Sequence, residues 1–511
     1  MLYAYTKNMI TCKFKILLLL ALLSAAPGTH AQLKIGIARV NVTNTGPDIV
    51  VNDSLYVKAM VLDDGQTRGV IATIDAVALG EIGYIKNDYM AKVRAGVKSR
   101  LNIDPANVLV NASHCHGMVR PDVAELTITA IEMASRNLVP VKIGIGKGFE
   151  DRIMENRRLR LSNGREADVR HRYALPPDQE VAGVGPVDPE IGIVRFEKED
   201  GRPVAVIYNF ACHPIQGVYS EGRRDNTADY PGFASAVLES NLGSGALAFF
   251  LQGCAGDINP VRYKDVFTPR SAEPLGRMLG FSTLKALGQM HTTRSGFINI
   301  VNETIGLPRA DLAQAIDSLK KRQQYLFDSI DGTSLDFKSF LQLYLQQKIS
   351  GEYPSAHAFN YLHEKQLGHR ELELFDKENK AKVKAYLENI YRMEELTRIK
   401  ENLALLTKHQ QTNLAAPKNT IDVEIFAIKI GNCVIVSFPG ELSVQIGLNI
   451  KKRSPFPFTF ITGCSNGYIY YAPTDEQLKN RGGAQEDSEC LLGTGWQKIY
   501  EDKVIEIINK I

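Results

Sequence analysis

Two imidazoles stand two residues apart in the stretch Asn111-Ala-Ser-His114-Cys-His116-Gly117. The stretch follows the apolar run Val108-Leu-Val110, which is short enough for a buried strand and too short for a helix. Side chains alternate between the two faces of a strand, so His114 and His116 point to the same side. Neutral imidazole is the commonest protein ligand for a transition metal. The pair is a candidate metal site, although one histidine capping a loop and the other packed in the core would give the same pattern.

Another histidine ends the apolar run Val206-Ile-Tyr-Asn-Phe-Ala-Cys-His213-Pro214. Proline cannot donate to a β-ladder, so it ends the strand and places His213 where strand meets loop. Active-site residues of α/β folds commonly lie at such strand ends. His213 is a further candidate ligand, and the alternative is a half-buried histidine at a corner of the chain.

A glycine-rich turn follows the apolar run at 249–251 and carries Gly256, Asp257 and Asn259. Glycine lets the backbone approach a ligand and donate N–H groups to it. Asp257 could equally be a turn former that bonds its own backbone. This turn alone is therefore compatible with either a ligand site or a structural corner.

Two later segments also place polar groups after apolar runs. The run 434–438 is followed by Pro439-Gly440 and one carboxylate, Glu441, and the segment 466–474 holds Tyr468, Tyr470 and Tyr471. Tyrosine clusters of this kind are usually packing features. The carboxylate repeats the pattern of a chemically active group at the end of a buried strand.

The elements that carry these groups alternate between strand-like and helical patterns. Strands are predicted over 34–42, 55–62, 69–77, 108–111, 191–196, 204–210, 246–251, 423–430, 433–438 and 458–461, and helices over 81–101, 123–136, 233–242 and from about 495 to the end. This alternation predicts an α/β fold with mixed β-sheets flanked by helices.

Two segments interrupt that alternation. Residues 156–186 are rich in Arg, Pro, Gly and Asp and are predicted to form a long excursion, which in a compact domain is more often functional than idle. Residues from about 308 to 415 are helical in pattern and highly charged. They are predicted to form a helical insertion that packs on the sheet or covers a cleft.

The N-terminus has the pattern of a secretory signal peptide over residues 1–31. Lys7, Lys13 and Lys15 precede an apolar run at 16–26, and Thr29-His-Ala31 offers small residues for cleavage. That run is too short to span a bilayer, and no other run is long enough, so no transmembrane segment is predicted. We expect the mature domain, 32–511, to be exported to the periplasm or the extracellular space.

The net charge and the cysteine content bear on which partners and which cross-links to expect. The chain of 511 residues carries 60 Lys and Arg against 57 Asp and Glu, and this net charge of +3 gives no reason to expect nucleic acid or an anionic membrane surface as a partner. Six cysteines remain after residue 31, widely spaced and mostly within apolar runs. An exported chain permits disulfides, but most of these cysteines are predicted to be small buried hydrophobes.

Together, five segments resemble one family, the neutral (non-lysosomal) ceramidases and the bacterial proteins that share their catalytic domain. The matching pieces occur in the family's order over roughly 34–474, and they are Ser113-His-Cys-His116-Gly, Asn209-Phe-Ala-Cys-His213-Pro, Gly256-Asp-Ile-Asn259-Pro, Phe438-Pro-Gly-Glu441 and Asn466-Gly-Tyr-Ile-Tyr-Tyr471-Ala-Pro-Thr474. The resemblance implies a ceramidase-like catalytic domain and a lipid amide substrate, N-acylsphingosine or a related N-acyl compound.

The resemblance also implies one zinc ion (Zn2+) per chain, held by His114, His213, Glu441 and Tyr471. Nitrogen and oxygen donors suit zinc, which lowers the pKa of a bound water to about 7 and so supplies a hydroxide that attacks an amide carbonyl.

Further roles are implied for residues around that ion. His116 is expected to act as an acid/base or to stabilise the oxyanion, and Arg157 is expected to hold substrate. Gly256 is expected at the substrate position, with Asp257 and Asn259 in the catalytic turn.

The sequence departs from the ceramidases in three places. Asn259 stands where their turn has a serine that contacts substrate, and Arg481-Gly482-Gly483 occupies the region of an expected tyrosine. Their C-terminal immunoglobulin-like domain is expected to be missing, because the chain ends at Ile511. Three functions therefore stay open: a zinc hydrolase of N-acyl amides, a non-catalytic ligand-binding relative, and a zinc hydrolase of esters or other bonds.

Overall fold

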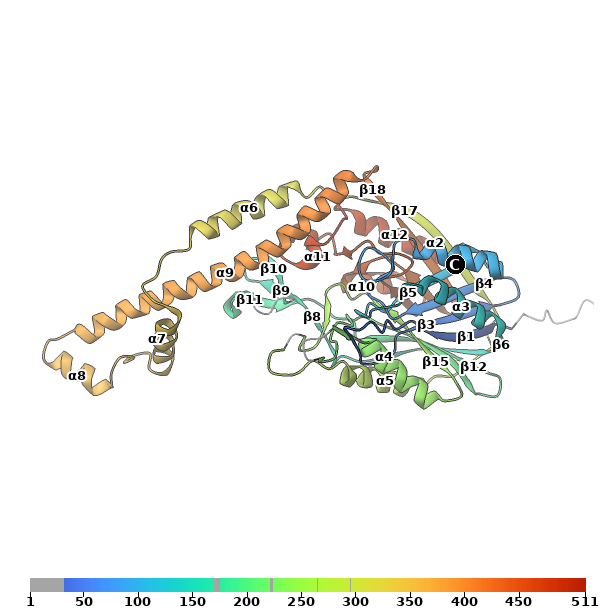
Figure 1. Ribbon diagram of the computed structural model, residues 1–511, viewed down its shortest axis with the longest axis horizontal. Helices are drawn as coiled ribbons and strands as arrows, with labels where there is room; N and C mark the ends of the chain where they lie inside the picture. Colours follow the sequence, from blue (N-terminus) through green and yellow to red (C-terminus); the bar gives the residue numbers. More distant parts are fainter. Residues whose placement is uncertain (1–31, 170–174, 221–223, 264, 295) are drawn as a thin grey trace, which may run out of the picture.

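The computed structural model describes residues 32–169, 175–220, 224–263, 265–294 and 296–511. The signal peptide predicted over 1–31 lies outside the described residues. Two layers of β-sheet face each other, with helices on both outer sides, and a long helical arm projects from one end (Figure 1). Among the described residues, no helix combines the length and the apolar character needed to cross a bilayer.

The first sheet has the strand order β5-β4-β3-β1-β6. Its strands are β1 (Lys34–Asn41), β3 (Tyr56–Asp63), β4 (Arg68–Ile74), β5 (Val108–Ala112) and β6 (Val139–Pro140). Neighbours are antiparallel except β4 and β5, which run parallel. The helices α2 (Tyr89–Leu101) and α3 (Val123–Arg136) cover its outer face.

The second sheet has the order β15-β13-β12-β7, and the third has the order β17-β18-β19-β21. Their strands are β7 (Lys142–Phe149), β12 (Glu190–Glu197), β13 (Pro203–Phe210), β15 (Leu247–Gln252), β17 (Ile298–Pro308), β18 (Thr420–Ile430), β19 (Cys433–Ser437) and β21 (Phe458–Thr462). Each sheet has one parallel pair, β13 with β15 and β19 with β21. The helices α4 (Asp229–Leu242) and α5 (Glu273–Leu287) pack on the second sheet.

Short strands and helices complete the body. They are β2 (Ile49–Val51), β8 (Met154–Asn156), β9 (Arg158–Leu161), β10 (Glu166–Asp168), β11 (Val181–Val184), β14 (Arg224–Asn226), β16 (Ile258–Pro260), β20 (Glu441–Leu442), β22 (Tyr471–Ala472), α10 (Val444–Arg453), α11 (Gln485–Ser488) and α12 (Trp496–Lys510). Strands β10-β9-β11 form a sheet, and β14-β2, β16-β8 and β20-β22 form pairs.

One hydrophobic core lies where the three large sheets meet. Met60 and Ile71 of the first sheet, Phe249 of the second, and Phe426 and Phe460 of the third are fully buried in one cluster. Burying a large apolar side chain contributes roughly 1.5–3 kcal/mol, so this packing fixes the sheets relative to one another. Their strand ends are consequently held in fixed positions.

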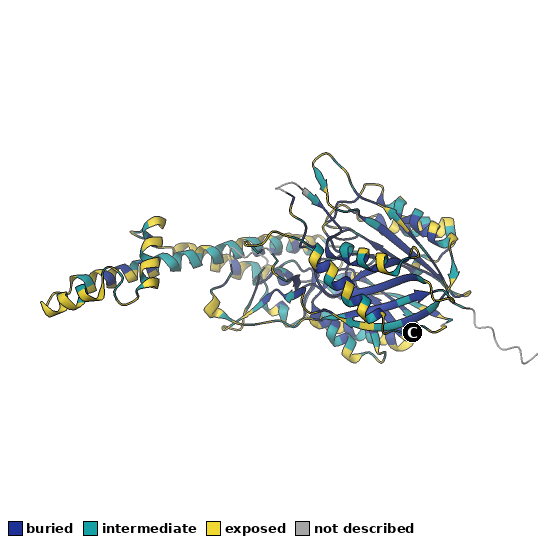
Figure 2. Cartoon of the chain, turned by 90° about the horizontal axis from the view of Figure 1, so that it is seen from below, coloured by how far each residue is buried: buried dark blue, intermediate teal, exposed yellow. Residues whose placement is uncertain are grey.

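The arm is inserted between β17 and β18. These strands pair along their whole length, with Pro308 opposite Thr420 at the end from which the arm leaves. Its helices are α6 (Ala313–Asp328), α7 (Phe337–Ile349), α8 (Ala358–Gln366) and the 45-residue α9 (Glu371–Ala415). Helices therefore occupy the segment predicted to be a helical insertion over about 308–415, and most of them extend away from the sheets (Figures 1 and 2).

The predicted α/β architecture of mixed sheets flanked by helices is confirmed. All ten predicted strands are present, and helix 123–136 corresponds to α3. The helix predicted from residue 81 begins only at Tyr89, because Glu81 and Gly83 have positive φ angles of 59° and 75° that an α-helix does not accommodate. The segment 156–186, predicted as an irregular excursion, contains the small β10-β9-β11 sheet.

The six cysteines after residue 31 are free and buried, as predicted for small hydrophobes.

Candidate metal centre

Several strands end at one place in the molecule. His114 follows β5, His213 follows β13, and Glu441 begins β20 after β19. Glu441 is paired in register with Tyr471 of β22, so these two residues are neighbours across strands. Asn111 fixes the arrangement, since its side-chain amide donates to the carbonyl of Gly463 and its oxygen accepts the N–H of Gln252. The ends of three sheets are thereby joined around the histidines.

The backbone at this junction is unusual. His114 has φ of 69°, and Cys464, Asn466 and Tyr470 also have positive φ. A non-glycine residue in this region costs of order 1–3 kcal/mol, and such residues cluster at functional sites because the surrounding structure has to enforce them. At His114 the backbone N–H donates to the carbonyl of Ala76 at 2.9 Å, which holds the strained turn in place.

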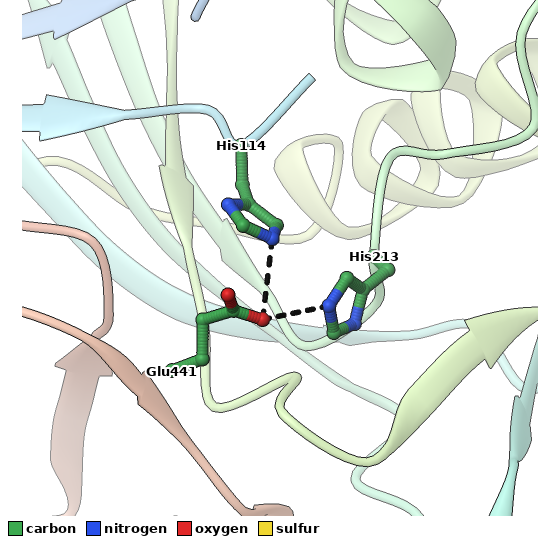
Figure 3. Close-up of side chains that lie close together, drawn as sticks. All are labelled: His114, His213 and Glu441. Atoms are coloured by element: carbon green, nitrogen blue, oxygen red, sulfur yellow. Dashed lines mark hydrogen bonds and ion pairs between the residues drawn. The ribbon is translucent and has the colours of Figure 1, made fainter. Parts of the chain in front are cut away.

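Three side chains converge on one point (Figure 3). Glu441 Oε2 lies 3.2 Å from His114 Nε2 and 2.8 Å from His213 Nε2. One donor atom from each residue lies within 4.8 Å of the others, and all three side chains are buried. We call His114, His213 and Glu441 the buried trio. These atoms are close enough to bind one ion together.

The far nitrogen of each imidazole is already bonded. His114 Nδ1 is 2.6 Å from the carbonyl oxygen of Val77, and His213 Nδ1 is 3.0 Å from that of Ile258. A carbonyl only accepts, so each Nδ1 carries its proton and donates it. In the neutral ring, Nε2 then carries a lone pair directed toward the other members of the trio. Metal-binding histidines are held in this way in most proteins.

Two tyrosine hydroxyls lie close to the trio. The hydroxyl of Tyr471 lies 3.5 Å from His213 Nε2, and the hydroxyl of Tyr468 donates to Glu441 Oε1. Burial raises the pKa of Glu441, but the neighbouring His114 and His213 lower it well below its usual range. Glu441 is therefore an anion. Burial lowers the pKa of His114, but Glu441 and Cys464 raise it well above its usual range.

A cavity of about 190 Å³ opens at the trio. His116 lies on its wall, with its ring 6.2 Å from that of His114. Burial by surrounding protein, together with His114 and His213, lowers the pKa of His116 to about 4, so its ring is neutral at pH 7. The remaining lining combines apolar Val77, Ile82 and Ile215 with polar Tyr263, Gln485 and Glu489.

Arg157 also reaches this cavity but is buried and paired. Its guanidinium lies 5.4 Å from the centre of the Tyr471 ring and forms an ion pair with Glu486 of α11. Glu486 simultaneously binds Arg158 at 2.9 Å. The guanidinium of Arg157 also donates to the carbonyl of Gly256 at 2.7 Å and to Asn259 Oδ1 at 3.2 Å.

The predicted turn residues lie behind Arg157 rather than on the cavity wall. Gly256 donates its N–H to the carbonyl of Leu442, and a Cβ at Gly256 would come within 2.8 Å of the carbonyl oxygen of Glu441. Asp257 accepts the N–H of Val444 at 2.8 Å, at the start of α10. Asn259 is fully buried, and its Nδ2 has no partner among the described residues. The turn therefore contacts Glu441, α10 and Arg157 without lining the cavity itself.

Sequence reasoning did not single out two residues of the site. Tyr468 was grouped with packing tyrosines, although its position in the tyrosine motif was the available signal. Glu486 lies in a short helix, and nothing in its local sequence distinguishes it from a surface glutamate. Its partnership with Arg157 joins residues 329 positions apart.

Two larger cavities, of about 1020 and 670 Å³, lie against the arm, and Leu319 and Arg322 of α6 line both. Their walls are rich in charged side chains, including Arg160, Arg165 and Arg322, and none of the buried trio lines either one. The smaller cavity at the trio is therefore the one placed for metal chemistry.

Comparison with known proteins bears on the fold. No family model matches the chain. Among solved structures, a ceramidase complexed with C2 is 15% identical, with a TM-score of 0.58, and a neutral ceramidase from Pseudomonas aeruginosa is 14% identical, with a TM-score of 0.57. Each alignment covers 94% of this chain and 75% of the ceramidase chain. The chain has the neutral ceramidase fold, as the order of its five motifs predicted.

Proposed function

We propose that the protein is an exported, zinc-dependent hydrolase of an amide bond in an N-acyl lipid of the ceramide class. The observation that carries this proposal is the buried trio, in which two histidine nitrogens and one carboxylate oxygen converge beside a cavity. The fold shared with the neutral ceramidases and the signal-peptide pattern of residues 1–31 give further support.

The donor set fits a zinc ion. Zinc prefers four-coordinate sites of nitrogen and oxygen donors, and in catalytic sites three or more protein ligands leave a position for water. Both trio histidines direct Nε2 inward because Nδ1 is bonded to a carbonyl. The negative charge of Glu441 is buried, and a divalent cation offsets such a charge. Tyr471 is the nearest candidate for a fourth ligand.

When bound, zinc would supply a water of lowered pKa and would polarise the amide carbonyl. His116, neutral and 6.2 Å from His114 between ring centres, is positioned to take the proton released by the attacking water and to pass it to the leaving amine. The ion pair with Glu486 holds Arg157 beside Tyr471, so its positive charge favours an oxyanion in the cavity. Gly256, Asp257 and Asn259 act by fixing Glu441 and Arg157.

The size of the cavity limits what enters it. Sites that enclose a whole small molecule usually measure roughly 300–1,000 Å³, and the cavity at the trio is about 190 Å³. It accommodates the amide and its nearest substituents. The acyl and long-chain base portions of a lipid substrate would lie outside it.

A non-catalytic binding protein is the second candidate, and one observation favours it. Asn259 occupies the position of the serine expected to contact substrate, yet it is fully buried and bonded to Arg157. If that contact is essential for turnover, the protein would bind zinc and ligand without hydrolysis.

The test combines metal analysis with a panel of fluorogenic N-acyl amides and the corresponding esters. Purified mature protein is expected to hold about one zinc per chain and to release the fluorophore from at least one amide. His213→Ala is expected to lose both the zinc and the turnover. The matched control is His369→Ala, because His369 belongs to an exposed group with Glu364 and Glu371 on the arm.

Each outcome separates the candidates. Zinc without turnover on any amide or ester supports the binding protein. Turnover of esters alone assigns the trio to ester hydrolysis. Zinc content that falls in His369→Ala but not in His213→Ala would remove the basis of the proposal.

A further inference from the structure

Large apolar side chains are concentrated on the outer part of the arm. Residues 325–375 expose Tyr325, Phe327, Ile330, Phe337, Leu341, Leu345, Ile349, Phe359, Leu362, Leu367, Leu374 and Phe375. Exposed residues accumulate toward the end of the arm that lies farthest from the sheets (Figure 2). Isolated exposed apolar residues are common on soluble proteins, but a contiguous group marks an interaction surface.

One face of α7 is fixed against the arm itself. Phe340 is 5% exposed, and its ring stacks on Tyr386 of α9 with 4.4 Å between ring centres. Tyr344, one turn later, stacks on Phe340 at 5.6 Å. Because these contacts hold α7 on α9, the opposite face of α7 points away from the protein.

That outward face has a specific composition. Phe337, Leu341, Leu345 and Ile349 recur every four residues, so they form a continuous ridge, and they are 64%, 42%, 50% and 85% exposed. The other exposed residues within α7 are Lys338, Gln342, Gln346 and Lys348. No acidic residue occurs within Phe337–Ile349. The preceding Asp336 caps the helix by accepting the N–H of Ser339 at 2.7 Å.

We infer that α7 docks the protein on an anionic lipid surface, with its apolar ridge in the interface and its two lysines at the level of the headgroups. Helices that bind membrane surfaces combine a large apolar face with basic residues beside it. Lysine side chains bury their aliphatic stems and keep the ammonium in the headgroup layer. The positive charge is confined to α7, because residues 325–375 together carry seven Asp and Glu against four Lys and Arg.

A second copy of the chain fits this face less well. Self-association through α7 would bring Lys338 and Lys348 of both copies into one interface, and no carboxylate of α7 would neutralise them. A stable interface also needs about 800 Å² from each partner. A 13-residue helix, about 20 Å long, offers only a single ridge.

The arm reaches well beyond the body of the protein. Its 45-residue helix α9 is about 70 Å long, with α7 and α8 packed near its first half. The other end of α9 lies beside the candidate metal centre, where Lys408 donates to the Tyr470 hydroxyl at 3.3 Å. Docking through α7 would therefore hold the centre at a set distance from the lipid surface.

The test is co-sedimentation of the purified full chain with vesicles of phosphatidylcholine, with and without about 30% phosphatidylserine. The wild type is expected to bind the anionic vesicles at least about tenfold more strongly. Neutralising both lysines, Lys338→Gln with Lys348→Gln, is expected to weaken that binding about 30-fold. Leu341→Gln with Leu345→Gln is expected to weaken it about tenfold or more, through lost apolar burial.

The matched control changes an exposed phenylalanine and lysine on a helix of the body, Phe281→Gln with Lys285→Glu in α5. It is expected to bind as the wild type does, and circular dichroism checks that every variant is folded. Absence of binding, equal binding to both vesicle types, or equal loss in the control would overturn the inference. So would light scattering that shows a dimer converted to monomer by Leu341→Gln with Leu345→Gln. None of these readouts depends on hydrolysis, so they stand apart from the proposed activity.

Discussion

Within the described residues, histidine and glutamate side chains come together at two places, with donor atoms within 4.8 Å in each. One is the buried trio at the strand ends. The other, which we call the arm trio, consists of Glu364 of α8, His369 of the following turn and Glu371 of α9. By donor type and spacing alone, both would qualify as metal sites.

Their surroundings differ in every other respect. The members of the arm trio lie within eight residues of sequence and are partly or fully exposed, so water hydrates them. The members of the buried trio are separated by up to 327 positions, and both of its imidazoles are oriented by backbone carbonyls. The comparison teaches that close donors are not enough. Burial and the bonds behind each ligand decide whether a cation is needed.

The largest expected effect of this difference is on folding stability, and it concerns the buried ion pairs that Glu486 forms with Arg157 and Arg158. Glu486→Gln leaves Arg157 and Arg158 without their shared carboxylate, and removing one partner of a buried ion pair costs about 3–5 kcal/mol. On the arm, Glu395→Gln breaks the exposed pair with Arg322 and is expected to cost under about 1 kcal/mol. Urea unfolding of both variants measures this, and equal costs would show that burial is not what separates the two regions.

Metal affinity is expected to show the next largest effect. Glu441→Gln removes the anionic donor of the buried trio, and zinc affinity should fall by more than about 100-fold, since residues behind metal ligands alone account for 10–100-fold. Glu371→Gln in the arm trio should leave tight binding unchanged. Competition with a zinc-binding dye measures both, and the opposite ranking would assign the tight site to the arm.

His409 extends the comparison to a buried histidine that has no acidic neighbour bonded to it. It lies in α9 against Tyr470, and neither ring nitrogen has a hydrogen-bond partner among the described residues. Burial, with Lys408 and Arg481, lowers the pKa of His409 to about 4, whereas its unfolded value is near 6.5.

The direction of the pH effect follows from those values. The unfolded chain binds the proton first as pH falls, so His409 costs stability between about pH 6.5 and 4, by roughly 3 kcal/mol in total. His409→Leu should remove that part of the acid sensitivity. Urea unfolding at pH 7 and pH 4.5 tests it, and an unchanged loss in the variant would mean that His409 is not the group responsible.

The smallest expected effect is on zinc affinity, and it concerns the hydrogen bond that Tyr468 donates to Glu441. Tyr468→Phe removes the hydroxyl that donates to Glu441 Oε1 and should weaken zinc binding about tenfold. Tyr361→Phe, which removes a hydroxyl that bonds Ser355 on the arm, is the matched control. Equal affinities in both variants would contradict a role for Tyr468 in holding Glu441.

Local patterns in the sequence predicted most of the framework. Period-two and apolar runs identified strands such as β1, β3 and β13, because burial imposes those patterns directly on the chain. They also placed His114 and His213 at strand ends. The start of α2 was predicted eight residues early, because positive φ angles at Glu81 and Gly83 leave no clear mark in composition. Strands β7 and β17 were missed, since β7 contains three glycines and both strands are only partly buried.

By itself, the sequence determined the α/β class, the histidines and carboxylate that converge, and the helical character of the segment near 308–415, because these depend on local spacing and on the order of motifs. The tertiary structure decided which donors share one point, how Glu486 orders Arg157, and that Asn259 lies behind the cavity. It also decided that one face of α7 is turned outward. These features join residues far apart in the chain, and only packing brings them together.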